Sequence, residues 1–358
     1  MRILYLYAEL MGYQVPVLEV YVRKYGCEVH VVHWDHNKLT PYAPPILNGI
    51  AYYPRSAYDR GGLVQLAAKI RPQIACVSGW MDRDYLSVCR FLRSEGIPVV
   101  SGFDDVWTGS LRQKVASFVP SALRRRYFSH AWVTGPYQFE FAARLGFKKE
   151  ETIFNCYSAD VPLFNKAFHS SRPSKIVKYP HRFLCVARFD PVKGIDLLVD
   201  AWRDLRGKRK DWELCFVGNG PLGESLAKVP EVSVKPFVPP EGLLDEAAAS
   251  GCLVLPSRKE PWGVVLHEFA AAGLAIICSD VCGAAPMFVT PGANGYIFRA
   301  GDLDSLQRSM LNIINSSDET LQDFSTRSHE YGQHITPDLT AASFMSILER
   351  QNLSGTPS

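Results

Sequence analysis

Short apolar runs alternate with helix-length amphipathic segments along most of this chain. A strand of a parallel sheet is buried on both faces and reads as a nearly continuous apolar run, so this alternation predicts parallel sheets with crossover helices. The expected fold class is therefore α/β, arranged as two Rossmann-like halves. Eleven runs are expected to be strands: RILYLYA, EVHVVHW, IACVSGW, PVVSGF, HAWVTG, FLCVAR, ELCFVG, VSVKPF, CLVLPS, AIICSD and GYIF.

The length of the chain supports two domains. Its 358 residues suffice for two units of about 150 to 200 residues, each with its own core. Residues 165–181, NKAFHSSRPSKIVKYPH, are polar and contain prolines, so a linker is predicted there. The second half is expected to begin near Phe183.

Composition excludes several classes of protein. A hydrophobic content of 47% and a charged content of 21% are those of a globular domain, and no run approaches the roughly 20 apolar residues of a membrane span. The N-terminal MRILYLYAEL reads as a buried strand rather than a signal peptide, so a cytoplasmic location is predicted. A net charge of +3 is too small to indicate nucleic acid as a partner.

The nine cysteines are odd in number and lie mostly within apolar runs. This placement predicts reduced core residues. Cys278 and Cys282 form the only close pair, and without a second pair or a neighbouring histidine they do not make a zinc site.

The segment SRKEPWGVVLHE, residues 257–268, has the composition of an anion site. Glu260 is expected at a helix N-cap with Pro261 in the first helical position, so Trp262, Gly263, Val264 and Val265 would supply N–H groups that no earlier turn satisfies. Eight residues of helix rise about 12 Å and leave Glu268 on nearly the same side as Glu260. One carboxylate could then hold a sugar and the other a ribose, with a phosphate between them.

Charged residues follow several of the predicted strands. Arg188 follows FLCVA, Glu260 follows CLVLPSRK, and Asp104 follows PVVSGF. In open α/β sheets ligands collect at the carboxyl ends of the strands, so all three are expected to face one cleft between the halves. Arg188, Lys193 and a helix N-terminus would together hold a pyrophosphate.

From about Phe183 to Leu306 the sequence resembles retaining nucleotide-sugar glycosyltransferases of the GT-B fold. Glu260 and Glu268 match the family's motif of two glutamates separated by seven residues. The resemblance rests also on FLCVARFDPVKGIDLLVDAWRDL, LCFVGNGP and SDVCGAAPMFVTPGANGYIF. It implies that Glu260 contacts the donor sugar, that Glu268 contacts the ribose, and that Arg188 and Lys193 bind the diphosphate.

The resemblance also implies the overall organisation and the reaction. An acceptor-binding domain is expected over residues 1–170 and a donor-binding domain over 171–335, facing a deep interdomain cleft. Residues 336–358 would form a helix that crosses back to the first domain, followed by a disordered tail. The implied enzyme is a hexosyltransferase-type glycosyltransferase that transfers a sugar from a UDP- or GDP-sugar to a glycan or lipid-linked acceptor in polysaccharide assembly. No cofactor and no metal ion are expected.

The N-terminal half departs from the family's pattern. The loop after the first strand has the single Gly12 in place of a glycine-rich loop, so close approach of backbone to phosphate is possible only there. Phe103 stands at the usual position of a histidine, and Asp104 after it is either a polar contact to the sugar or acceptor, or a helix cap. In the second half, Phe237 and Val238 occupy the loop in which relatives hold the nucleobase.

Other functions remain open at this point. A glycoside hydrolase needs two carboxylates about 5 to 9.5 Å apart, and Glu260 and Glu268 are expected to be farther apart. A GT-B sugar-nucleotide epimerase, a phosphorylase and a non-catalytic nucleotide-binding partner subunit are the alternatives, because a fold does not determine a reaction. The triplet Asp82-Arg83-Asp84 has a metal-binding spacing, although such triplets often arise by chance.

One segment indicates contact with a membrane. Residues 111–127, LRQKVASFVPSALRRRY, carry five basic and no acidic residues among apolar ones, with Pro120 as a break. A basic amphipathic segment suits an anionic lipid surface, and lipid-linked acceptors reside there. The alternative is a solvated helix face over the core. Peripheral contact at the inner face of the cytoplasmic membrane is therefore a hypothesis.

Overall fold

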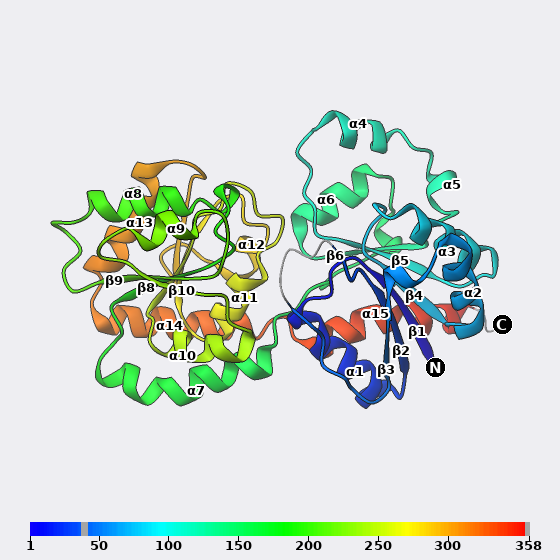
Figure 1. The fold of residues 1–358 in the computed structure, drawn as a ribbon, viewed down its shortest axis with the longest axis horizontal. Helices are drawn as coiled ribbons and strands as arrows, with labels where there is room; N and C mark the ends of the chain where they lie inside the picture. Colours follow the sequence, from blue (N-terminus) through cyan, green and yellow to red (C-terminus); the bar gives the residue numbers. More distant parts are fainter. Residues whose placement is uncertain (37–41, 355–358) are drawn as a thin grey trace. The chain divides into compact units, whose positions relative to one another are not determined.

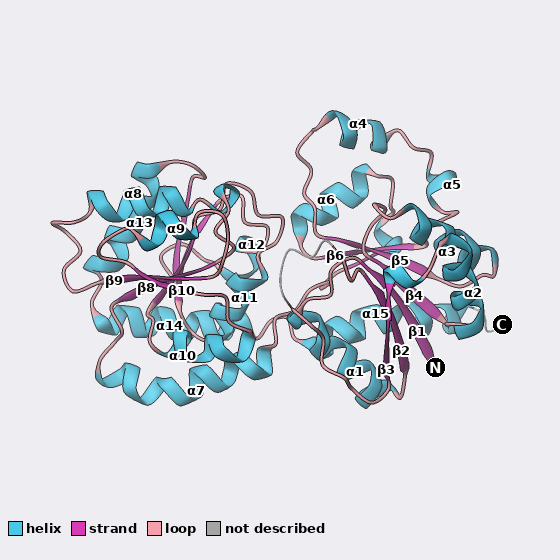
Figure 2. Ribbon diagram, viewed as in Figure 1, coloured by secondary structure: helices cyan, strands magenta, loops and turns pink. Residues whose placement is uncertain are grey.

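The computed structural model describes residues 1–36 and 42–354. The chain forms two compact units, one of residues 1–158 and 335–358 and the other of residues 159–334 (Figure 1). Each is a parallel sheet with helices on both faces (Figure 2). The predicted α/β class with two Rossmann-like halves is therefore confirmed.

The first unit contains a seven-stranded sheet of order β3-β2-β1-β4-β5-β6-β7. Every neighbouring pair is parallel. Alternation along β1 sends Ile3 and Tyr5 to one apolar core and Leu4 and Leu6 to the other. The strands are β1 (Arg2–Tyr7), β2 (Glu28–His33), β3 (Ile50–Pro54), β4 (Ile74–Val77), β5 (Val99–Phe103), β6 (His130–Val133) and β7 (Thr152–Ile153).

Helices of the first unit cover both faces of this sheet. Residues of the first and last helices join one apolar core, and residues of the second, third and sixth helices join the other. The helices are α1 (Val15–Tyr25), α2 (Arg60–Ile70), α3 (Arg83–Ser94), α4 (Leu111–Ser117), α5 (Ser121–Arg124), α6 (Pro136–Arg144) and α15 (Pro337–Ser354).

The second unit contains a six-stranded parallel sheet of order β10-β9-β8-β11-β12-β13. Its strands are β8 (Arg182–Val186), β9 (Glu213–Val217), β10 (Ser233–Lys235), β11 (Cys252–Leu255), β12 (Ala275–Ser279) and β13 (Gly295–Phe298). Figure 1 shows α8, α9 and α13 on one face of this sheet and α7, α10 and α14 on the other. The helices are α7 (Val161–Val177), α8 (Ile195–Asp204), α9 (Gly223–Ala227), α10 (Leu243–Ala248), α11 (Val264–Ala271), α12 (Ala285–Phe288), α13 (Leu303–Asn315) and α14 (Asp318–Gly332).

All eleven predicted strands are present, and the structure adds β3 and β7, which the sequence analysis missed. Both are end strands of the first sheet. β3 has only one buried residue, Ile50, and β7 has only two residues, so neither presents a long apolar run. The nine cysteines are buried free thiols, as predicted. In the part of the chain that the structure describes, no helix combines the length and the hydropathy needed to cross a bilayer.

The predicted linker at residues 165–181 is wrong, because most of it lies in α7. Phe164 and Ala167 of α7 pack into a core with Leu184, Leu253 and Phe269. This apolar face keeps the segment helical even though it contains a proline. The units divide at 158/159 and 334/335, where the sequence analysis placed boundaries at 170/171 and 335/336. The last four residues of the predicted tail lie outside the described residues.

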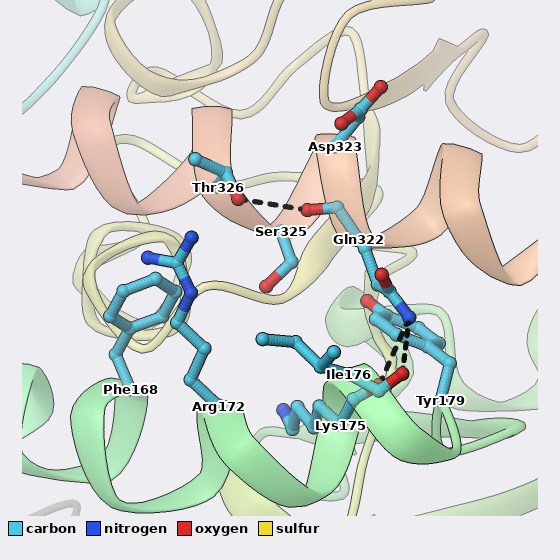
Figure 3. A pocket seen from close by; sticks show the side chains of 9 residues that line it. All are labelled: Phe168, Arg172, Lys175, Ile176, Tyr179, Gln322, Asp323, Ser325 and Thr326. Carbon is cyan, nitrogen blue, oxygen red and sulfur yellow. Dashed lines mark hydrogen bonds between the residues drawn. The ribbon is translucent and has the colours of Figure 1, made fainter.

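Lys175 explains part of this error. In the sequence it reads as a linker charge, yet it is 6% exposed and its Nζ donates to the carbonyl oxygens of Ala247 at 2.8 Å and Ser250 at 2.9 Å. Burial lowers the pKa of Lys175 to about 7. It lines a cavity of about 220 Å³ between α7 and α14 (Figure 3), to which none of the predicted site residues contributes.

Lys175→Met is predicted to remove a pH dependence from the free energy of unfolding. The folded pKa of about 7 lies below the usual 10.5, so the unfolded chain binds more protons between these values and wild-type stability rises with pH there. Relative to the variant, the wild type should gain about 1 kcal/mol for each pH unit above 7. Urea denaturation between pH 7 and 10 measures this. The exposed Lys166→Met on the same helix is the control, and a flat difference would refute the assignment.

Candidate functional site

The second sheet has a topological switch point beside β8. From β8 the chain proceeds to β9 and β10 on one side, and then returns to β11 on the other side of β8. In open α/β sheets the crevice at the carboxyl ends of two such strands is the usual ligand site. Arg188 and Lys193 follow β8, and Glu260 follows β11, so all three belong to this edge.

Lys193 and Glu260 form an ion pair across the switch point. Lys193 Nζ lies 2.6 Å from Glu260 Oε2, and Ser257 Oγ donates to the same oxygen at 3.2 Å. Only 19% of the Lys193 side chain and 9% of the Glu260 side chain are exposed. The structure thus brings together two of the predicted site residues that are 67 positions apart in the sequence.

Backbone contacts hold the two loops of this ion pair together. Arg258 N donates to Val192 O at 2.8 Å, and the Arg258 guanidinium donates to Pro191 O and pairs with Asp196. Gly194 has φ +69°, and a Cβ there would lie 2.0 Å from Pro256 O. The loop after β8 therefore packs closely against the residues that follow β11, and this packing places Lys193 beside Glu260.

Gly194→Ala tests this close approach. The substitution adds a methyl group against backbone in a left-handed conformation, so it should destabilise the fold by at least about 2 kcal/mol more than Gly292→Ala. Gly292 is the matched control, because its φ is +76° and a Cβ there meets nothing within 4 Å. Urea midpoints of the two variants give the comparison. Equal losses would show that the approach is not rigid.

The predicted N-cap at Glu260 is wrong. The α11 helix begins at Val264 with Gly263 as its N-cap. Residues 260–262 instead pair with the loop after β12: Gly283 N donates to Glu260 O at 3.1 Å and Ala284 N donates to Trp262 O at 2.9 Å. This pairing holds Glu260 in a β-bridge to Cys282, and Pro261 follows in a bend, so the helical geometry predicted between the two glutamates does not apply.

The N-terminus of α11 still lies beside this pair. Its first N–H groups, at Val264 and Val265, have no earlier helical turn to bond with, and they carry the positive end of the helix dipole. Pro261 is partly buried and Trp262 is 3% exposed, so these two residues support the segment. The amides that follow Gly263 therefore form the positive end of α11.

Glu268 lies on the second turn of α11 and is partly buried. Burial, and after it the charge of Asp160, raises the pKa of Glu268 to about 7. Asp160 is the N-cap of α7 and accepts a hydrogen bond from Leu163 N at 3.1 Å. The carboxyl group at the N-terminus of α7 therefore lies close enough to the carboxyl group of Glu268 on α11 to raise its pKa.

The raised pKa predicts how Glu268 affects stability. The folded pKa of about 7 exceeds the usual 4.5, so the folded chain binds more protons between these values and stability falls as pH rises from 4.5 to 7. Glu268→Gln should remove a fall on the order of 1–3 kcal/mol. Denaturation at pH 5 and pH 8 measures it. Glu224→Gln, at an exposed glutamate, is the control, and an unchanged pH dependence in Glu268→Gln would contradict the assignment.

Arg188 is held near the end of β9. Its Nη2 lies 3.1 Å from Asp190 Oδ2, and 36% of the side chain is exposed. Phe189 between them is buried and donates its N–H to Asn219 O at 2.8 Å. The loop after β8 can approach the end of β9 this closely because residue 218 is a glycine. A Cβ at Gly218 would lie 1.9 Å from Ala187 O.

Asn219 also reaches the loop predicted to hold a nucleobase. Its Oδ1 accepts the N–H of Phe237 at 3.3 Å. Phe237 is 37% exposed, and Val238 packs against the core that contains Leu243. The structure therefore links the loops that follow β8, β9 and β10.

The candidates in the first unit lie at the carboxyl edge of its own sheet. Gly12 opens a 3-10 turn after β1. Asp104 follows β5 and is exposed, and Tyr157 Oη donates to its Oδ2 at 3.4 Å. The alternative of a helix cap at Asp104 is wrong, because the next helix begins at Leu111 with Ser110 as its N-cap. Phe103 is a core residue that packs on Phe141.

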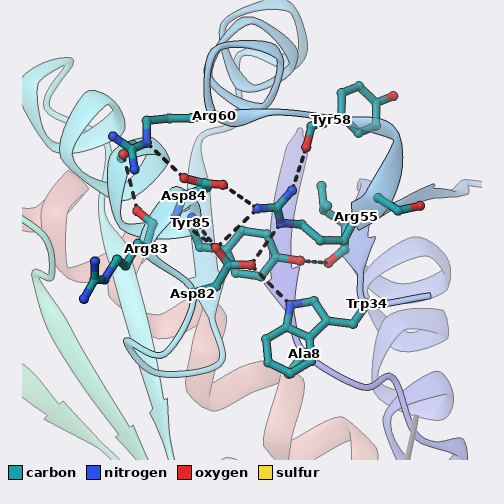
Figure 4. A network of polar contacts seen from close by, with 12 residues as sticks. Ala8, Trp34, Arg55, Tyr58, Arg60, Asp82, Arg83, Asp84 and Tyr85 are labelled. Carbon is teal, nitrogen blue, oxygen red and sulfur yellow. Dashed lines mark hydrogen bonds and ion pairs between the residues drawn. The ribbon is translucent and has the colours of Figure 1, made fainter. Parts of the chain in front are cut away.

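The triplet at Asp82 is a structural ion-pair network (Figure 4). Arg55 pairs with Asp82 at 2.9 Å and with Asp84 at 2.7 Å, and Arg60 pairs with Asp84 at 2.9 Å. Although burial opposes it, the hydrogen bond from Arg55 holds the pKa of Asp82 below its usual value. Among the described residues, no cluster of three or more His, Cys, Asp or Glu could hold a metal ion.

Several residues of this site were not predicted from the sequence. Ser257 holds Glu260, Asp160 influences Glu268, and Asn219 supports Phe237. Ser257 stands at the start of the segment SRKEPWGVVLHE and Asn219 lies within GNGP, so each was within a quoted motif. No motif in the sequence identified Asp160, because it lies 108 positions before Glu268 and only the fold brings the two residues together.

Solved structures share the fold over nearly the whole chain. Sucrose-phosphate synthase from Thermosynechococcus elongatus superposes with a TM-score of 0.73 at 16% identity, covering 99% of this chain and 100% of that one. HepE of Anabaena in complex with UDP also gives a TM-score of 0.73, at 15% identity, covering 98% of this chain and 100% of that one.

Sequence relatives match a shorter segment. An uncharacterized glycosyltransferase of Methanocaldococcus jannaschii is 31% identical over 144 residues, which is 38% of this chain and 38% of the relative. A GDP-mannose-dependent phosphatidylinositol monomannoside mannosyltransferase of Mycolicibacterium smegmatis is 27% identical over 145 residues, 37% of this chain and 38% of that protein. The matched segment thus spans well under half the length of these relatives.

The two parallel sheets and these structural matches define the class: the chain has the GT-B fold. Residues 168–331 match the family described as glycosyl transferases group 1. The resemblance to glycosyltransferases inferred from the motifs is confirmed for this segment of the second unit, and the retaining mechanism stays a prediction.

Proposed function

We propose that the chain is a retaining glycosyltransferase that transfers a sugar from a UDP- or GDP-sugar to a glycan or lipid-linked acceptor. The observation that carries this proposal is the ion pair of Lys193 with Glu260 at the switch point, beside the N-terminus of α11. A cation and helix amides suit a diphosphate, while a carboxylate at the same place suits sugar hydroxyls.

The chemistry needs a stabilised leaving group. The bond between the anomeric carbon and the phosphate oxygen breaks, the acceptor oxygen bonds to that carbon on the same face, and the acceptor proton passes to a phosphate oxygen. Arg188, Lys193 and the amides of Val264 and Val265 would stabilise the charge of the departing nucleoside diphosphate. No side chain has to act as a nucleophile, and independence from metal ions stays a prediction.

In this scheme Glu260 exchanges one partner, Lys193, for another, the donor sugar. In the structure Lys193 occupies Glu260 Oε2. A diphosphate would draw Lys193 toward itself, since a doubly charged oxyanion group attracts an ammonium more strongly than one carboxylate does. Glu260 could then accept hydrogen bonds from the donor sugar. The carboxyl group of Glu268 would meet the ribose, and Asp104 of the first unit would contact the sugar or acceptor.

The names of relatives support the donor class. One structural neighbour was solved in complex with UDP-glucose, and one sequence relative is named as GDP-mannose-dependent. The proposed donor therefore carries uridine or guanosine, and the loop of Phe237 and Val238 is the proposed contact for its base. A glycan or a lipid-linked acceptor is the proposed second substrate in polysaccharide or glycoconjugate synthesis.

Binding assays with two variants separate the proposed roles. Arg188→Ala should weaken free UDP or GDP and the matching nucleotide sugar equally, by roughly 10- to 100-fold, because both carry the diphosphate. Glu260→Ala should weaken the nucleotide sugar about tenfold relative to the free nucleotide. It should leave the free nucleotide unchanged or bound more tightly, since Lys193 loses its competing carboxylate.

Calorimetry with UDP, UDP-glucose, GDP and GDP-mannose provides these affinities. Arg203→Ala, an exposed cation on α8, is the matched control for lost charge. Identical effects of the Arg188 and Glu260 variants on nucleotide and nucleotide sugar would refute the assigned roles. Release of nucleoside diphosphate only in the presence of an acceptor would distinguish transfer from epimerisation, and binding without turnover would favour a non-catalytic subunit.

A further inference from the structure

The α4 helix of the first unit carries its large apolar side chains on the outside. At about 100° per residue, Leu111 and Val115 fall on one face of α4. Phe118, the residue just after the helix, continues that face. The three side chains are 78%, 63% and 84% exposed. Val119 and Leu123, at 41% and 43% exposed, extend this surface through the following turn and α5. We call these five side chains the apolar patch.

The inward face of α4 is the polar one. Gln113 Nε2 donates to Val106 O at 2.8 Å, and Gln113 Oε1 accepts the N–H of Thr108 at 2.8 Å. On the same side, Ala116 packs against the core of the unit. A helix that only covers a core has the reverse arrangement, with its large apolar residues inward. The outward patch therefore needs a partner from outside the unit.

Cations surround the apolar patch. Arg112 and Lys114 are exposed and lie on either side of the stripe, and Arg125 and Arg126 are exposed on the α5 side. No acidic residue occurs from Leu111 to Tyr127. Long basic side chains beside an apolar stripe can reach lipid phosphates while the stripe enters the boundary with the acyl chains.

Arg124 has a different role and fixes the segment in place. It is 7% exposed, lies 3.7 Å from the Phe147 ring centroid, and pairs with Glu151 at 3.0 Å. This buried contact ties α5 to the body of the unit. Figure 1 shows α4 and α5 at the edge of the first unit, away from its sheet. The patch is thus a supported surface that projects outward.

We propose that α4 and α5 dock on an anionic lipid surface, with the apolar patch inserted at the headgroup level. A second copy of the chain is a poorer occupant, because an isologous contact would place the same cations against one another. The α4 helix begins seven residues after Asp104, and Asp104 itself follows β5 at the carboxyl edge of the sheet. Given the function proposed above, docking would present this edge to a lipid-linked acceptor.

Sedimentation with vesicles tests the proposal on the full chain. Vesicles of phosphatidylcholine with phosphatidylglycerol should bind the protein at least tenfold more tightly than phosphatidylcholine alone, and added salt should weaken the binding. The double variant Val115→Asp with Phe118→Asp should lose binding by at least tenfold. Ile46→Asp is the matched control, since Ile46 is 98% exposed in the same unit and outside the patch.

The cations are tested separately. Arg112→Gln with Arg126→Gln should weaken binding by roughly fivefold for each charge removed. Lys69→Gln with Arg90→Gln, two exposed cations elsewhere in the unit, should bind as the wild type does. Unfolding midpoints should remain unchanged in all these variants, because every substituted side chain is exposed.

Three results would overturn the proposal. The first is equal binding to both kinds of vesicle or to neither, and the second is wild-type binding by the Val115 and Phe118 double variant. The third is a concentration-dependent dimer in sedimentation velocity that this double variant abolishes, which would assign the patch to a second copy. Vesicle binding needs no turnover, so its failure is separate from failure of the transfer reaction.

Discussion

The ion pair of Lys193 with Glu260 is the interaction on which the site of the second unit depends. It joins the loop after β8 to the loop after β11, and these loops belong to the two strands that flank the switch point. Arg188 is likewise paired, with Asp190. Both cations of the site therefore already have an anionic partner, and the helix N-terminus adds positive potential beside the Glu260 carboxylate.

Under the proposed function, this balance of charge would couple the two ends of a nucleotide sugar. A diphosphate that recruited Lys193 would release one oxygen of Glu260, so the sugar would gain its acceptor of hydrogen bonds only after the phosphates arrive. Free nucleotide would have to displace Lys193 without gaining those sugar contacts. Discrimination between a nucleotide and a nucleotide sugar would then arise from competition within the site, in addition to the direct contacts that each ligand makes.

Sequence pattern predicted the sheets well and the exact backbone of the site less well. Long apolar runs identify strands buried on both faces, whereas β3 and β7 at the sheet ends bury too little to be seen. Pro261 after Glu260 reads locally as the start of a helix, but hydrogen bonds from Gly283 and Ala284 keep this segment outside the helix, which begins at Val264. Those partners are more than 20 positions away, so only the fold shows the contact.

The same limit applies to α4 and to α7. A stripe at positions 111, 115 and 118 reveals an amphipathic helix, yet the period alone does not say which side faces the protein. The hydrogen bonds of Gln113 decide it, because they place the polar side chain inward and leave Phe118 outward. In α7 the opposite case occurs, where Lys175 reads as exposed and is buried. A charge or an apolar group thus acquires its functional meaning from the backbone carbonyls that the fold places within its reach.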